Sequence, residues 1–201
     1  MIRIPFVKVV FIFCVAMAGA VLADPPATQT AEEKPSAPES SQKETKPSFS
    51  NGKFLITGLH CPPCTSTVEG SLRKTKGVRA IKVDWQTKNA LVEFDESVVS
   101  AQKIATLIAA TPHMMGSGMK YGGWLALRID GVDKDETAAK AKEVLGMVNG
   151  VAKVAVYPKQ SSVGVGFTSE GNVTMKELLA ALEKAGLKAA SFADKAPKAK
   201  S

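Results

Sequence analysis

Residues 54–64 read FLITGLHCPPC. The apolar run at the start of this stretch ends at Gly58, which predicts a β-strand followed by a tight turn. An amphipathic segment that ends at Gly77 comes next and predicts a helix. Cys61 therefore lies in the loop between a strand and a helix, and Cys64 lies at the start of that helix.

Beyond this helix the sequence predicts a hairpin and a second helix. Apolar and polar residues alternate over 81–85 and again over 90–94, with a turn at 87–89 between them. Apolar residues at helical spacing follow over 104–108, and Pro112 ends that helix. The order βαββα, with a final strand expected, is typical of the ferredoxin-like arrangement.

The chain also contains an internal repeat. A shift of 73 residues superimposes glycines and core-type residues in one ordered series without a gap. The identical pairs are Ile56/Ile129, Gly58/Gly131, Leu72/Leu145, Gly77/Gly150, Val78/Val151, Val92/Val165 and Phe94/Phe167. The second copy is expected to contain a strand at 124–130, a helix at 135–148, strands at 151–157 and 162–167, and a helix at 174–185.

We therefore predict an α+β fold with two tandem ferredoxin-like βαββαβ domains, at 53–123 and 124–190. The last strand of the first domain has two candidates. Either a short strand at 120–121 closes that domain, or one long strand from 124 to 129 serves both domains.

The segments outside these domains carry other signals. Residues 1–23 have basic residues, an apolar core and small residues before a cleavage point, which predicts a signal peptide. We expect export to the periplasm or the exterior, with an uncleaved N-terminal membrane anchor as the alternative. Residues 24–52 are rich in Pro, Ser, Thr, Glu and Lys and predict a disordered linker, and 191–201 predict a disordered basic tail.

Composition excludes several classes of protein. The chain has 201 residues and a formal net charge of +7, and its basic residues are not interleaved with aromatic ones, so no nucleic-acid partner is expected. Its folded part is too small for a large multi-layer enzyme. No catalytic Ser/His/Asp set, phosphate-binding loop or paired carboxylates are recognisable, so we expect a protein that is not an enzyme.

The spacing of Cys61 and Cys64 lets both sulfurs meet one ion. The helix N-terminus lowers thiol pKa values and favours thiolates. Two thiolates in an open loop suit a soft ion of low coordination number such as Cu(I), whereas a structural zinc site needs four ligands. A two-cysteine site can also bridge two protomers around one ion.

This stretch, with the helix and strand that follow it to Trp85, resembles the heavy-metal-associated domain. That family includes copper chaperones, N-terminal domains of metal-pumping ATPases and periplasmic mercury-binding proteins. The resemblance implies that Cys61 and Cys64 are metal ligands and that Leu59 is a packing residue. Pro62 and Pro63 depart from the family pattern and stiffen the loop.

In the second copy Lys134 and Thr137 replace the cysteines, so we expect it to bind no metal. Topology places the loop at 112–123 at the same end as the cysteines, so its soft donors His113, Met114, Met115 and Met119 become candidate auxiliary ligands. His60, in the cysteine loop itself, is a further candidate. The alternative is that the methionines pack between the domains. The resemblance also implies that Lys120 or Tyr121 lies beside the metal.

The sequence thus predicts an exported protein that holds Cu(I), or next Hg(II), with Zn(II) and Cd(II) less suited. It would pass the ion by ligand exchange to a membrane metal transporter or another metal-binding protein. One alternative is a thiol–disulfide oxidoreductase in which Pro112 plays the part of a cis-proline. The other is an interaction module with a vestigial site.

Overall fold

The computed structural model describes residues 49–192. The predicted signal peptide at 1–23, most of the predicted linker and most of the predicted tail lie outside the described residues. Within 49–192, the helices are too short or too polar to cross a membrane.

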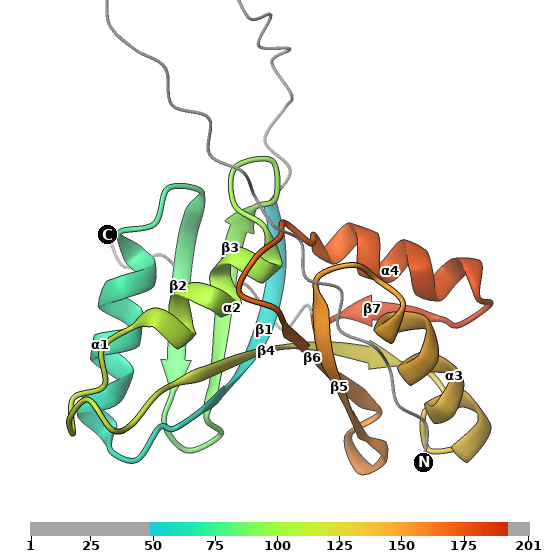
Figure 1. Cartoon of the computed structure of the whole chain (residues 1–201), viewed down its shortest axis with the longest axis horizontal. Coiled ribbons are helices and arrows are strands. Elements are labelled where there is room, and N and C mark those ends of the chain that lie inside the picture. Colours follow the sequence, from blue (N-terminus) through green and yellow to red (C-terminus); the bar gives the residue numbers. More distant parts are fainter. Residues whose placement is uncertain (1–48, 193–201) are drawn as a thin grey trace, which may run out of the picture. The chain divides into compact units, whose positions relative to one another are not determined.

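The fold is α+β and is built on one antiparallel sheet (Figure 1). The first part of the chain supplies β1 (Phe49–Thr57), α1 (Pro62–Arg73), β2 (Val78–Asp84), β3 (Asn89–Asp95), α2 (Ala101–Ala110) and β4 (Gly122–Ile129). The second part supplies α3 (Asp135–Gly146), β5 (Val151–Tyr157), a 3-10 turn η1 (Pro158–Gln160), β6 (Ser162–Phe167), α4 (Met175–Lys184) and β7 (Ala189–Ser191). The strand order is β2-β3-β1-β4-β6-β5, and β7 also pairs with β4.

Strand β4 belongs to both parts of the sheet. Its residues 122–126 pair with β1, while residues 125–128 pair with β6 and residues 127–129 pair with β7. The domain boundary predicted between residues 123 and 124 therefore falls inside one strand. Of the two candidate last strands, the structure has the long one. It is long enough to pair with β1 of the first part and with β6 and β7 of the second.

The two parts have the same strand register at an offset of 73 residues. Phe54 pairs with Ala90 in the first part, and Leu127 pairs with Val163 in the second. The β-bulges lie at matching places in the two parts. Glycines with a left-handed backbone also match, because they follow β1 and α1 in the first part and β4 and α3 in the second. These features are the bulges at 78/80 and 151/153 and the glycines Gly58, Gly131, Gly77 and Gly150.

Strand β1 begins earlier than the predicted domain start at residue 53. The predicted disordered linker includes residues 49–52, but they pair with residues 92–95 of β3. Phe49 also lies under the guanidinium of Arg79, 4.9 Å from ring centroid to Cζ. The linker prediction is wrong for these residues. Their composition alone does not show that β3 lies beside them and pairs with them.

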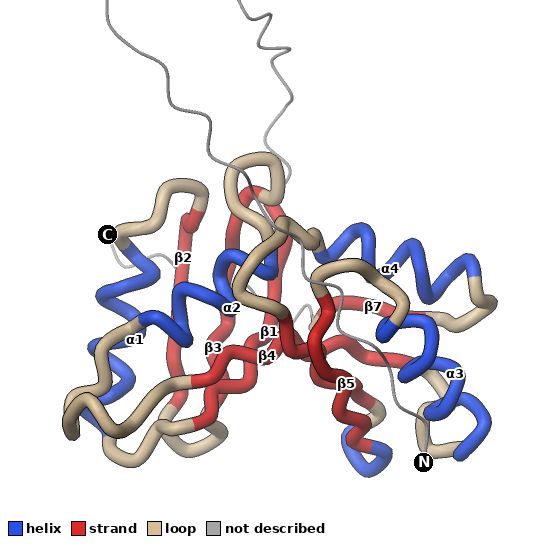
Figure 2. The backbone as a smooth tube through the Cα atoms, in the orientation of Figure 1, coloured by secondary structure: helices blue, strands red, loops and turns tan. Residues whose placement is uncertain are grey.

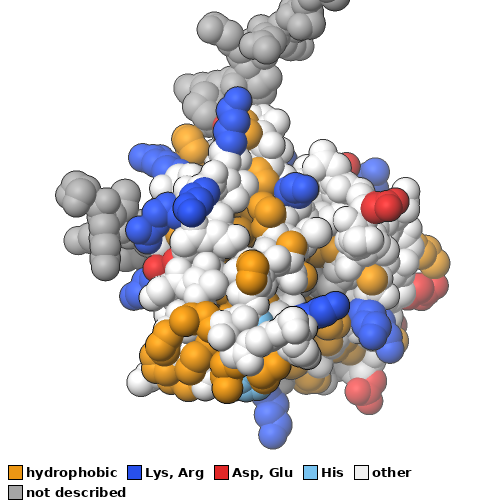
Figure 3. All heavy atoms as spheres, turned by 60° about the vertical axis from the view of Figure 1, so that its left-hand side comes forward, with side chains coloured by type: hydrophobic (Ala, Val, Ile, Leu, Met, Phe, Trp, Pro, Cys, Tyr) orange, Lys and Arg blue, Asp and Glu red, His pale blue; other side chains and the backbone are white. Residues whose placement is uncertain are grey.

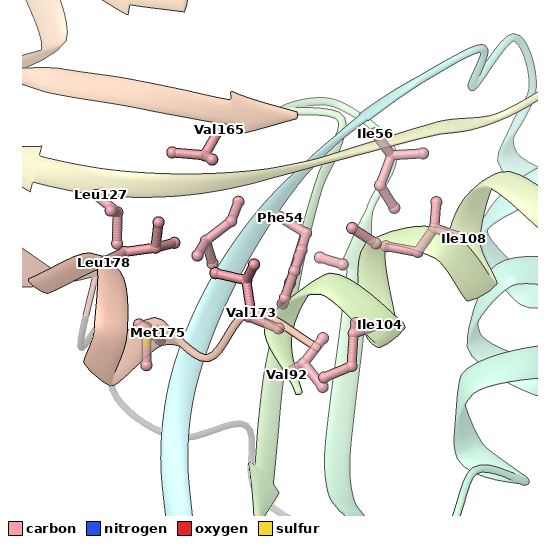
Figure 4. Packing of buried hydrophobic residues seen from close by; sticks show 14 of the residues in the cluster. Phe54, Ile56, Val92, Ile104, Ile108, Leu127, Val165, Val173, Met175 and Leu178 are labelled. Carbon is pink, nitrogen blue, oxygen red and sulfur yellow. The ribbon is translucent and has the colours of Figure 1, made fainter. Parts of the chain in front are cut away.

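The buried side chains form one core that runs through both parts (Figure 4). Phe54 and Ile56 of β1 point toward Ile104 and Ile108 of α2, while Leu127 of β4 points toward α4. Strand β4 is thus part of one core that includes residues of helices from both parts.

Candidate metal centre

The cysteine loop begins where β1 ends. Gly58 turns the chain with φ +84°, a conformation that favours glycine, and a Cβ there would collide with the carbonyl of Lys120. Cys61 is the residue before the first turn of α1, and Pro62 starts the helix. Proline suits this position because its φ is already helical and it lacks an N–H that would otherwise be unpaired.

The two sulfur atoms converge at this helix start. The distance from Cys61 Sγ to Cys64 Sγ is 2.6 Å, and the Cys64 N–H donates to the Cys61 carbonyl at 3.1 Å. Cys64 is buried and Cys61 is half-buried. One sulfur is therefore held inside the fold, and the other lies where an ion or an incoming ligand can reach it.

The surroundings give the two thiols different acidities. Burial raises the pKa of the Cys64 thiol, but the neighbouring Cys61 thiol, the Tyr121 hydroxyl and nearby backbone groups outweigh it and lower this pKa to about 7. The pKa of Cys61 is raised, first by its hydrogen bond to Cys64 and then by burial. One thiolate is thus available near neutral pH, and it is the buried one.

Tyr121 lies beside Cys64. Burial, and next the neighbouring Cys64, raise the pKa of Tyr121 to about 12, so its hydroxyl stays protonated. That buried hydroxyl has no hydrogen bond of good geometry within the described part of the chain. Lys120 differs, because its side chain is exposed and its backbone carbonyl packs against Gly58.

His113 is tied to backbone groups through both ring nitrogens. Its Nε2 is 2.9 Å from the Gly58 carbonyl oxygen, and its Nδ1 accepts from the Met115 N–H at 3.1 Å. Neither nitrogen is free to bind an ion in this arrangement. His60 is exposed, with its ring centroid 5.7 Å from that of His113.

The methionines of this loop are mostly at the surface. Met114 and Met115 are 57% and 61% exposed, so they do not fill a space between packed elements, whereas Met119 is half-buried. Figure 2 shows the α2–β4 loop and the β1–α1 loop at the same end of the fold. In Figure 3, hydrophobic side chains gather beside the histidines at the lower left of the view.

The corresponding position in the second part has different chemistry. Lys134 and Thr137 lie where the cysteines lie in the first part, and the exposed Asp135 and Glu136 form the acidic first turn of α3. Negative side chains at a helix N-terminus stabilise the helix by its dipole. In residues 49–192, no cluster of three or more His, Cys, Asp or Glu is placed to hold a metal ion.

Two other features bear on the chemistry of the cysteines. All peptide bonds in the described residues are trans, so Pro112 does not supply the cis-proline that the oxidoreductase alternative invoked. A hollow of about 360 Å³ beside Trp124 and Gly166 has no cysteine, histidine or carboxylate in its wall. The thiol pair therefore remains the strongest candidate site.

Comparisons with known proteins agree with this fold and this loop. Residues 53–113 match the model of the heavy-metal-associated domain. The chain is 32% identical over 56 residues to the copper chaperone CopZ of Enterococcus hirae, covering 28% of this chain and 81% of that protein. It is 35% identical over 49 residues to the periplasmic component of mercuric transport of Serratia marcescens, covering 24% of this chain and 54% of that protein.

Larger relatives match over more of the chain. The copper-transporting ATPase 1 of Rattus norvegicus is 28% identical over 121 residues, which is 59% of this chain but 8% of that ATPase. Among solved structures, oxidized MerP from Ralstonia metallidurans has 25% identity and a TM-score of 0.32, covering 38% of this chain and 97% of that one.

The fold and the thiol-pair loop define a class of small α+β domains with a cysteine pair between the first strand and the first helix. The chain belongs to the heavy-metal-associated domain family, through residues 53–113.

Proposed function

We propose that this protein binds one soft metal ion through Cys61 and Cys64 and passes it on by ligand exchange. The observation that carries the proposal is the convergence of two sulfurs at the start of α1, 2.6 Å apart. Thiolates prefer soft ions, and an open two-thiolate site suits Cu(I) best and Hg(II) next, with Zn(II) and Cd(II) less suited. Relatives named for copper and for mercury support a heavy-metal ion at this site.

The unequal burial of the two sulfurs suits a transfer step. An incoming thiolate reaches the ion on the Cys61 side, because Cys61 is half-buried and Cys64 is fully buried. A bond from the ion to the incoming sulfur forms as the bond to Cys61 breaks, and Cys61 takes up a proton on release. Cys64 holds the ion until a second incoming thiolate replaces it.

The wider setting is also part of the proposal. We place the protein outside the cytoplasm, directed there by residues 1–23, with a membrane metal transporter or another metal-binding protein as its partner. The second part of the fold would be a metal-free copy of the first ferredoxin-like domain. The common register at an offset of 73 residues supports this duplication.

A competition titration with Cu(I) against a chromophoric chelator tests the function. We expect one tight equivalent for the reduced protein, and its loss in the double variant Cys61→Ser/Cys64→Ser. A Met114→Leu/Met115→Leu/Met119→Leu variant is the matched control for the loop thioethers. Weaker binding in that variant would add the methionines to the site.

Equally poor competition by all three proteins would exclude Cu(I), and Hg(II) would be titrated next. The close approach of the sulfurs and the lowered pKa of Cys64 also suit thiol–disulfide exchange. Catalysed reduction of insulin, well above the rate of a free dithiol, would favour that oxidoreductase function over metal transfer.

A further inference from the structure

Two loops meet beside the cysteines, and His113 connects them. The first is the turn at Gly58, and the second is the segment from Pro112 to Tyr121. They approach so closely that any Cβ on residue 58 would collide with the Lys120 carbonyl. His113, in the second loop, reaches the Gly58 carbonyl oxygen at 2.9 Å.

The partners of His113 define the state of its ring. A carbonyl oxygen only accepts, so Nε2 carries the hydrogen and donates it to Gly58. A backbone N–H only donates, so Nδ1, which accepts a hydrogen bond from the Met115 N–H at 3.1 Å, carries no hydrogen. His113 is therefore the neutral imidazole with its hydrogen on Nε2, assigned from this hydrogen-bond network.

The ring also has a partner on its face. The centroids of the His113 and Tyr121 rings are 4.5 Å apart, with 32° between the ring planes. Tyr121 is buried against Cys64 and contributes to the low pKa of that thiol. A continuous series of contacts thus runs from the Gly58 turn through His113 and Tyr121 to the buried sulfur.

We propose that His113 is a positioning residue that holds the Gly58 turn and Tyr121 in place around the thiol pair, rather than a metal ligand. The inference rests on the proposed function, in which Cys61 and Cys64 hold the ion. Ligation by His113 would require one of its two hydrogen bonds to break, and a carbonyl or N–H of the loops would lose its partner.

His60 provides the matched comparison. It is next to Cys61 in the sequence and exposed, and within the described part of the structure its imidazole makes no hydrogen bond, only a ring contact with His113. If any histidine near the thiols acted by proximity alone, the two positions would respond alike to substitution. The geometry instead assigns the positioning role to His113.

Three variants test the proposal. His113→Phe keeps a ring against Tyr121 but removes both hydrogen bonds, His113→Gln retains a donor and an acceptor, and His60→Gln is the control. In the Cu(I) competition, we expect about tenfold weaker binding for His113→Phe, the effect of about one net hydrogen bond. His113→Gln should recover most of this loss, and His60→Gln should match the parent protein.

Nuclear magnetic resonance supplies the readout that separates positioning from ligation. Long-range ¹H–¹⁵N spectra of the imidazole should show the Nε2–H tautomer of His113 in both the metal-free and the Cu(I)-loaded protein. Loss of this tautomer on loading would show direct ligation and overturn the proposal. Equal affinities for the His113→Phe variant and the parent protein would overturn it as well.

Failure of the proposed function is distinguishable from failure of this inference. If the parent protein binds no Cu(I), the metal proposal fails, yet the metal-free spectra still report on His113. In that case, His113→Phe should shift the amide signals of residues 58–64 and the ring signals of Tyr121, and His113→Gln should shift them less. Unchanged signals in a folded His113→Phe variant would remove the positioning role.

Discussion

At the residue scale, the chemistry of the site depends on a difference between two identical side chains. A helix N-terminus near the cysteines predicts low thiol pKa values from the sequence. In the structure only Cys64 has a lowered pKa, about 7, while that of Cys61 is raised. The hydrogen bond between the sulfurs, and Tyr121 behind Cys64, produce this asymmetry, and neither is visible in the spacing of the motif.

This asymmetry predicts how many protons Cu(I) displaces. Between the two pKa values, near pH ~8, the metal-free pair holds one proton, so forming two thiolate ligands releases about one proton. Below the Cys64 pKa, near pH ~6, both thiols are protonated and release rises toward two. The apparent affinity therefore falls more steeply with decreasing pH below about 7 than above it.

Calorimetric titrations in buffers of different ionisation enthalpy measure this release. The Tyr121→Phe variant is the comparison, because without the hydroxyl the pKa of Cys64 should rise and the step should move to higher pH. Equal release at both pH values in the parent protein would contradict the assigned asymmetry.

At the element scale, helix α2 is fixed to the second part of the fold by a buried glutamine. Gln102, which is 1% exposed, donates through Nε2 to the carbonyls of Thr168 at 3.1 Å and Glu170 at 2.8 Å. Its Oε1 accepts from the Val173 N–H at 2.9 Å. The sequence predicts an amphipathic helix here, but the partners of this polar residue come from 66 to 71 positions further along the chain.

We expect Gln102→Ala to lower the free energy of unfolding by about 2–3 kcal/mol, because it leaves the buried Val173 N–H without its acceptor and removes the bonds to the Thr168 and Glu170 carbonyls. The adjacent, exposed Lys103→Ala is the control and should change stability by less than about 0.5 kcal/mol. Urea denaturation measures both, and hydrogen exchange should show lost protection at Val173. Equal stability of the two variants would mean that the loop from residue 168 to 173 is held by other contacts.

At the scale of the whole described molecule, the sharing of β4 couples the two parts. One strand pairs with β1 and β7 along one edge and with β6 along the other, and its side chains lie in one continuous core. Neither part can lose β4 without losing a strand of its own sheet. We therefore expect residues 49–192 to unfold as one cooperative unit.

Substitution in the shared strand tests this coupling. Leu127→Ala removes a fully buried side chain and should destabilise the protein by about 2–5 kcal/mol. The loss should be equal when it is measured from hydrogen exchange of the core amides of β3 and of β6, with the exposed Lys140→Ala as a neutral control. A loss confined to β6 would show that the parts unfold separately.

The sequence determined the local elements and the place of the cysteine pair between the first strand and the first helix. Apolar periodicity located the strands at 151–157 and 162–167 as the structure has them, and the helices at 135–148 and 174–185 to within two residues. It also placed the loop after α2 beside the cysteines, because the direction of each element in a βαββαβ unit follows from the order of elements. These properties depend on near neighbours in the chain, and a single sequence contains that information.

Only the tertiary structure decided the sharing of β4, the strand pairing of residues 49–52, the inequality of the two thiols and the bonds of His113. Each depends on groups that are distant in sequence and meet only after the chain has folded. A strand edge, a buried sulfur or an imidazole acquires its role from whichever partner the fold brings within hydrogen-bonding distance, and local pattern does not specify that partner.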